Sequence, residues 1–183
     1  SVASIMRDNQ DIPDRIGNML RYGRIASVDL ASGRITVAVG EIETQPIRWA
    51  TGGSGGTRVW SRPKIGEQVV LLCPDGDITG AFALRGLDCD AFPPVGDPDR
   101  ELVEFEDGAT IGYDPNAHAL AVVLPAGATV SIVAPGGVTI DSDVRITGDL
   151  IVHKDVKAVG VSLRHHKHLQ VQPGQGVSGV PQP

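Results

Sequence analysis

The spacing of apolar residues changes twice along the chain. In residues 3–21 the apolar side chains recur at roughly helical intervals, and Pro13 suits a first helical turn, which predicts one or two short helices. This segment either packs on its own domain or docks a partner. From Gly23 the apolar positions alternate with polar ones, and a period of two predicts β-strands.

Residues 23–95 are expected to form a small barrel. Strand-like runs separated by turns occur at residues 24–29, 34–39, 44–49, 65–73 and 80–86. Five strands in such a short stretch are typical of a closed OB-type barrel. Residues 51–57 are rich in glycine and predict a flexible loop, but they lack the Gly-Lys-Ser/Thr ending of a phosphate-binding loop.

The second half of the chain has a different character. Three prolines within residues 93–98 end the first sheet, because proline cannot continue a sheet interior. Short strand-like runs then follow at residues 102–106, 109–114, 119–124, 128–134, 138–143 and 144–147. Their side chains are mostly Val, Ile, Leu, Ala and Thr, and Tyr113 is the one aromatic residue between 109 and 159.

Side chains this small and regularly spaced are poorly suited to fill a globular core alone. Repeated strand-turn units generally bury their apolar face by stacking on copies of themselves. The copies lie either in one chain, as a β-solenoid, or in three identical chains that share one narrow core. The stretch is short for a capped solenoid, so we favour the trimer, which also removes exposed strand edges.

Composition supports a β architecture. Aromatic residues make up only 4% of the chain, which also contains 23 Gly and 13 Pro. The net charge of −6 argues against nucleic-acid binding, because phosphate neutralisation requires Lys and Arg. Cys73 and Cys89 form no CxxC pair and no disulfide framework, so we expect reduced, buried thiols.

Membrane and export signals are not visible in the sequence. No run approaches the ~20 apolar residues that span a bilayer. Residues 1–10 lack a basic region followed by an apolar one, the pattern of a signal peptide. We therefore expect a soluble protein that is synthesised in the cytoplasm and meets any membrane from outside.

A histidine cluster carries the strongest chemical signal. In an extended strand, His166 and His168 project to one side, and His165 projects to the other. Two imidazoles are too few for a complete metal site, whereas three copies around a three-fold axis supply six nitrogens. Imidazole suits Fe, Ni, Zn or Cu. The alternative to a metal site is an exposed polar tail, since a lone HxH motif is a weak signal.

Two other functions compete with a structural one. An OB-fold nucleic-acid- or protein-binding module with a β-rich trimerisation stalk would use Trp49 and Trp60 to stack bases, although the acidic charge opposes this. A metalloenzyme would need an open coordination position and a nearby base. No GxSxG, HExxH or paired catalytic carboxylates occur, so we expect no enzyme and no small-molecule substrate.

Two blocks of the sequence resemble the baseplate assembly protein V family, the central spike of P2-like and Mu-like contractile tails and of R-type pyocins. The first block comprises residues 23–49 and 60–69 and resembles the OB-domain pattern of the family. The second comprises residues 161–163, His166-x-His168 and Ser178-Gly179-x-Pro181, and is similar to the tip motif. The chain departs from the family at His165, which permits a second ligand register, and at residues 169–171, where small residues are usual.

The resemblance implies an all-β homotrimer with a metal-stapled tip. Its parts would be an N-terminal helical docking segment at residues 1–22, an OB-fold barrel at 23–95, a triple-stranded β-helix stalk at 96–160 and a metal-binding tip at 161–183. It implies one iron ion per trimer, held on the three-fold axis by His166 and His168 of each chain. The expected partners are the tail hub and baseplate proteins, the expected target is the host outer membrane, and the expected location is the virion tail baseplate or a pyocin particle.

Overall fold

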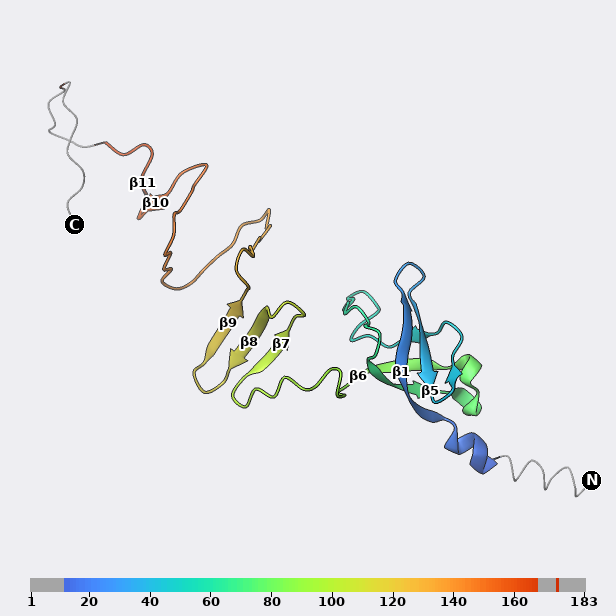
Figure 1. Ribbon diagram of the computed structural model, residues 1–183. Coiled ribbons are helices and arrows are strands. Elements are labelled where there is room, and N and C mark those ends of the chain that lie inside the picture. The colour runs from blue at the N-terminus through green and yellow to red at the C-terminus, as the bar shows by residue number, and fades with distance from the viewer. Residues whose placement is uncertain (1–11, 168–173, 175–183) are drawn as a thin grey trace, which may run out of the picture. The chain divides into compact units, whose positions relative to one another are not determined.

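A computed structural model describes residues 12–167 and Gly174, which form two compact units, one up to Thr129 and one from Val130 onward. A short helix at residues 12–17 precedes a curled six-stranded sheet with the order β3-β2-β1-β5-β6-β4 (Figure 1). Its strands are β1 (Leu20–Asp29), β2 (Arg34–Val39), β3 (Ile42–Glu43), β4 (Arg48–Trp49), β5 (Gln68–Leu72) and β6 (Phe82–Leu87). This mostly antiparallel, OB-like arrangement confirms the predicted class of the first domain.

Alternation along the strands builds the core of this barrel. The side chains of Val37, Val69, Leu71 and Ala83 are completely buried, and each has more exposed neighbours on its own strand. The curled sheet closes at Ile47, which directly precedes β4 and exchanges backbone hydrogen bonds of 2.8 and 3.1 Å with Ile35 of β2. The apolar alternation therefore closes a core within a single chain.

The boundaries of the barrel differ in detail from the sequence prediction. β1 begins at Leu20 and therefore includes three residues that were assigned to the helical segment. In place of the expected third strand at residues 44–49 the structure has two short strands, β3 and β4. The amide of buried Thr44 donates to the Val37 carbonyl oxygen at 2.9 Å, but its hydroxyl accepts from the Val37 amide at 3.0 Å, so a side chain replaces one backbone bond of the ladder. The glycine-rich loop carries an antiparallel bridge between Ser54 and Arg58, so it has some regular pairing of its own.

A second, three-stranded sheet completes the first unit. Strands β7 (Glu101–Glu104), β8 (Thr110–Asp114) and β9 (Ala119–Val123) form an antiparallel meander. The sequence assigned residues 96–160 to a stalk paired between chains, whereas these three strands pair within the chain because tight turns at residues 106–108 and 115–118 allow local hairpins. Lys64, in the loop before β5, donates to both carboxylate oxygens of Glu106 at 2.6 Å, which lowers the pKa of that carboxyl.

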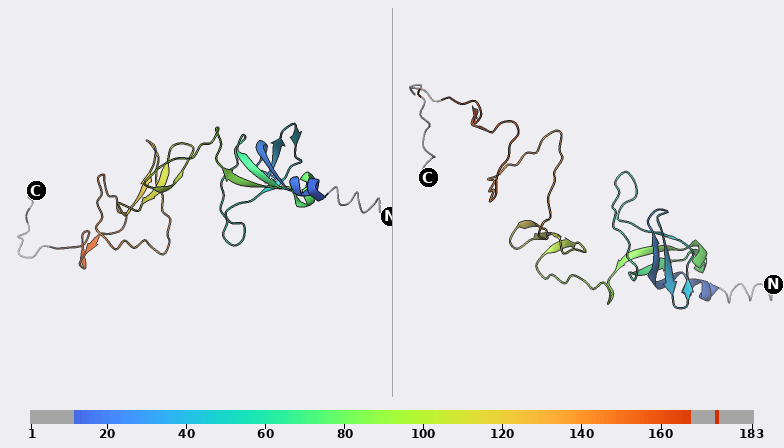
Figure 2. Two further views of the ribbon diagram at one scale, coloured as in Figure 1. Left: turned by 90° about the horizontal axis from the view of Figure 1, so that it is seen from below. Right: turned by 45° about the horizontal axis from the view of Figure 1, so that its top comes forward.

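The second unit contains very little regular structure in the part of the chain described. Residues 124–156 form no strand, although runs at 128–134, 138–143 and 144–147 were predicted to be strands. Figure 2 shows this segment from two further sides, running without arrows until β10 (Lys157–Ala158) and β11 (Val161–Ser162). A strand needs a hydrogen-bonding partner, and the single chain offers this segment none.

Gly23 provides a test of the barrel core. A Cβ atom added there would lie 2.4 Å from Val37 Cγ1 and 2.8 Å from the Ala38 carbonyl oxygen. We expect Gly23→Ala to lower the free energy of unfolding of the barrel by about 1–3 kcal/mol, because overpacking forces strained side chains or backbone shifts. Urea or thermal unfolding measures this, with Gly80→Ala as the control, since nothing lies within 4 Å of a Cβ at that position. Equal losses in both variants would contradict the crowding at Gly23.

Candidate functional site

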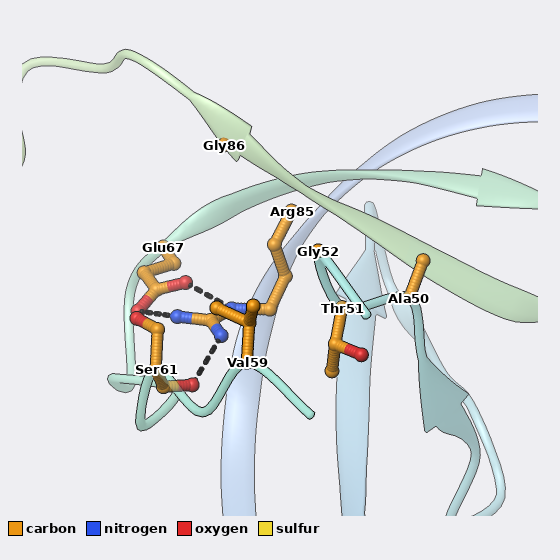
Figure 3. Close-up of a pocket in the computed structure, with 8 residues that line it drawn as sticks. All are labelled: Ala50, Thr51, Gly52, Val59, Ser61, Glu67, Arg85 and Gly86. Carbon is orange, nitrogen blue, oxygen red and sulfur yellow. Dashed lines mark hydrogen bonds and ion pairs between the residues drawn. The ribbon is translucent and has the colours of Figure 1, made fainter. Parts of the chain in front are cut away.

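One hollow of the barrel surrounds an ion pair. It is a shallow pocket of about 280 Å³ lined by Ala50, Thr51, Gly52, Val59, Ser61, Glu67, Arg85 and Gly86 (Figure 3). Arg85 projects from β6, and Glu67 immediately precedes β5. The Arg85 side chain is 14% exposed and the Glu67 side chain 17%, which makes this the most buried ion pair among the described residues.

The guanidinium of Arg85 is engaged by the chain itself. Its Nε and Nη2 donate to the two carboxylate oxygens of Glu67 at 2.7 and 2.8 Å, and its Nη1 donates to the Ser61 carbonyl oxygen at 2.7 Å. Glu67 also accepts a hydrogen bond from the Lys64 amide at 2.7 Å. A planar guanidinium that donates to several acceptors in this way holds those partners in one geometry. The cluster therefore clasps residues 61–67 to β6, and its donors are directed at the protein.

The two tryptophans lie beside this clasp. Trp49 and Trp60 have ring centroids 6.0 Å apart with planes tilted by 49°, a favourable aromatic geometry. Trp60 is 62% exposed, whereas the indole nitrogen of Trp49 is buried without a hydrogen-bond partner among the described residues. The pair presents one aromatic ring to solvent, next to a basic loop that includes Arg58 and Arg62.

The second unit displays an apolar surface that nothing in its own chain covers. Every Val, Ile and Leu between residues 130 and 163 is exposed, from 38% at Val156 to 105% at Val159. In a monomeric protein, contiguous apolar exposure of this extent marks an interaction site. The apolar side chains of this region are visible in the sequence, and the structural finding is that none of its Val, Ile or Leu residues is buried within one chain.

A six-residue repeat underlies this surface and was missed by our sequence interpretation. Residues 138–143, 144–149 and 150–155 each place Val or Leu first, Ile or Val third and Asp sixth. The signal was present in the sequence as three consecutive matches at constant spacing, but the shorter strand-like runs obscured it. The repeat gives each six-residue unit two apolar side chains two positions apart, which therefore share one face of an extended segment.

The end of the last repeat is fixed by its aspartate. The carboxylate of Asp155 accepts a hydrogen bond from the Arg164 amide at 3.1 Å, and the Ser162 hydroxyl lowers the pKa of the Asp155 carboxyl. Between them, Val159 and Gly160 have φ values of 48° and 84° in the turn that joins β10 to β11. A β-branched residue rarely adopts positive φ, so the tip of this hairpin is strained at Val159.

The predicted metal ligands are only partly described. His166 follows β11, and its Nδ1 lies 2.9 Å from the Leu163 carbonyl oxygen and 3.2 Å from that of Ser162. The amide of His165 donates to the Ser162 hydroxyl at 2.9 Å. His168 lies outside the described residues. Within residues 12–167 and Gly174, no three His, Cys, Asp or Glu side chains gather as a metal site, so one chain does not provide one there.

The structure also describes the two cysteines, which were expected to be reduced and buried. Both cysteines are free, Cys73 is buried and burial raises its thiol pKa, while Cys89 is only half-buried. No helix in the described part of the chain is long and apolar enough to cross a membrane.

Comparisons with known proteins connect these features. Residues 21–87 match the family described as the Type VI secretion system/phage-baseplate injector OB domain. The chain is also 37% identical over 131 residues to a protein of Escherichia phage P2 named "Spike protein", an alignment that covers 71% of this chain. It covers 61% of the phage P2 protein, so the chain spans about three fifths of the length of that relative.

Replacement of Arg85 tests whether the clasp holds the loop. We expect Arg85→Gln to speed tryptic cleavage at Arg58 several-fold and to lower the free energy of unfolding by about 1–3 kcal/mol, because Glu67 then remains half-buried without its partner. Limited proteolysis followed by mass spectrometry measures the cleavage rate. Arg48→Gln is the control, since Arg48 is exposed on β4. Unchanged cleavage in Arg85→Gln would show that other contacts hold the loop.

Proposed function

Because this chain belongs to the family of phage baseplate spike proteins, we propose that three copies of it form the membrane-piercing needle at the centre of a contractile tail. In this proposal the OB-like barrels form a collar, and the segment after residue 130 forms the stalk and the tip. The particle is a phage tail or a pyocin, and the target is the outer membrane of the host cell. The role is structural and mechanical, with no catalytic step.

The exposed apolar surface of residues 130–163 is the observation that carries the proposal. Full burial of a Val, Ile or Leu side chain contributes roughly 1.5–3 kcal/mol. One chain obtains only part of this stabilisation from its second unit, because each of these side chains keeps at least 38% of its surface exposed. Three extended chains wound around one axis would bury the first and third residues of each six-residue repeat and pair every strand edge, forming an intertwined triple-stranded β-helix.

Such a structure suits force transmission. Its core is continuous along the axis, and the small side chains keep it narrow. Sheath contraction would drive the collar toward the cell, and the stalk would concentrate the force on a small area of the outer membrane. The collar and residues 1–22 would bind the tail hub, for which the exposed side chains of Ile12, Ile16 and Met19 offer an apolar surface.

The chemistry of the tip residues fits an iron ion. A proton on Nδ1 of His166 would be donated to the Leu163 carbonyl oxygen at 2.9 Å, and this tautomer carries the imidazole lone pair on Nε2. A backbone carbonyl in this position is a common orienting partner for metal-binding histidines. His166 and His168 of three chains would supply six imidazoles on the axis, a donor set suited to a first-row transition metal. The bound ion would add stability to the assembled tip.

Neighbouring residues of the first repeat test the proposed trimer. We expect the parent chain to be trimeric at micromolar concentration, and Ile140→Asp to weaken the trimer at least about tenfold, because it places a charge in the shared core. Thr139→Asp is the matched control, exposed in the single chain as Ile140 is but on the opposite side of an extended segment. Sedimentation or native mass spectrometry gives the stoichiometry. A monomeric parent chain would contradict the proposal.

Metal content tests the tip separately. Untagged protein that has not contacted a nickel column should contain one iron ion for every three chains by elemental mass spectrometry. His166→Ala combined with His168→Ala should remove the iron and speed proteolysis of residues 161–183, because the chain ends lose their common ligand. His153→Ala should retain it. Iron that survives the double substitution but is lost in His165→Ala would assign the other ligand register.

A further inference from the structure

The meander of β7, β8 and β9 has two unequal faces. On one face the register brings together two cross-strand rows, Glu101–Tyr113–Leu120 and Val103–Ile111–Val122. We call the five apolar members the apolar face; all of them are exposed in the single chain, from 43% at Tyr113 to 71% at Leu120. The other face carries the rows Leu102–Gly112–Ala121 and Glu104–Thr110–Val123; the first row is buried or half-buried, whereas Glu104 and Val123 are exposed.

Charge is kept away from the apolar face. Residues 88–129 contain nine acidic residues against one arginine, a net charge of −8 and the most acidic part of the chain. In the two cross-strand rows only Glu101 is charged, and it lies at the end of its row. Nearly all the acidic side chains of this segment therefore lie outside the apolar face. That distribution suits a face that is buried in a protein interface while the rest of the segment stays in water.

We propose that the apolar face is buried against the same face of two other copies of this chain, so that three meanders enclose a second, triangular core. This inference rests on the proposed trimer and adds a contact that the stalk repeat does not predict. It gives the meander a role within the trimer: each chain contributes a finished sheet here, whereas residues 130–156 contribute only unpaired segments.

Two observations favour other copies of this chain as the occupant. Leu124 extends the apolar pattern of β9, and the sequence continues within a few residues into the exposed apolar positions from Val130 onward, which the proposed trimer buries between chains. In addition, β7 and β9 are the outer strands of the meander, and within the described residues neither outer edge is paired. Closure of three sheets around an axis would protect these edges, which otherwise tend to aggregate. The acidic residues would then face outward.

Adjacent valines give a matched test in the full-length chain. Val122 and Val123 are 54% and 53% exposed in the single chain and lie on opposite faces of β9, so lysine affects the monomer similarly at either position. We expect Val122→Lys to weaken the trimer at least about tenfold in sedimentation, and Val123→Lys to leave it unchanged. Equal effects of the two substitutions on a trimeric parent would overturn the inference, whereas a monomeric parent would overturn the proposed trimer itself.

Thiol labelling gives a second measurement that does not depend on dissociation. In the assembled protein, Leu120→Cys should react with a bulky maleimide at least about tenfold more slowly than Ala119→Cys, although both positions are exposed in the single chain. The parent chain corrects for Cys73 and Cys89. Rapid labelling at position 120 in an intact trimer would overturn the inference. If tail hub protein, added to the trimer, then blocked that labelling, the face would be assigned to the hub.

Discussion

The whole molecule depends on where an apolar side chain can find a partner. In the barrel, alternation along three strands brings Val37, Val69, Leu71 and Ala83 into one core, and a bridge between Ile35 of β2 and Ile47 closes the curled sheet. After residue 130 the apolar positions continue, but one chain offers them no covering surface. The same hydrophobic effect that completes the first unit therefore leaves the second unit dependent on other chains.

Much of this organisation could be predicted from the sequence. The barrel strands were predicted because turns punctuate a clear period of two, and runs at residues 102–106, 109–114 and 119–124 became β7, β8 and β9. Their pairing within the chain was not predicted, since periodicity identifies a strand but not its partner. For the same reason, periodicity did not reveal that the runs between residues 128 and 147 have no pairing partner in a single chain.

The ion-pair clasp escaped prediction for a different reason. Arg85 and Glu67 are 18 positions apart and belong to no motif, so they resemble ordinary surface charges. The antiparallel pairing of β5 with β6 brings them together beside Ser61. The histidines are the opposite case: their spacing suggested a metal site, yet the site requires a three-fold axis that a single sequence does not contain. His166 is placed next to the Leu163 carbonyl, and the ligand set stays a prediction.

The uncovered stalk has a consequence for the synthesis of the protein. The barrel and meander pair residues that are mostly close in sequence, so they can form soon after each chain leaves the ribosome. The stalk would then wait as an exposed apolar ribbon until two further chains arrive, and its maturation rate would depend steeply on concentration. Aggregation competes during that interval. A cell that makes this protein slowly would therefore lose more of it than one that makes it in a burst, even though every chain folds its first unit equally well.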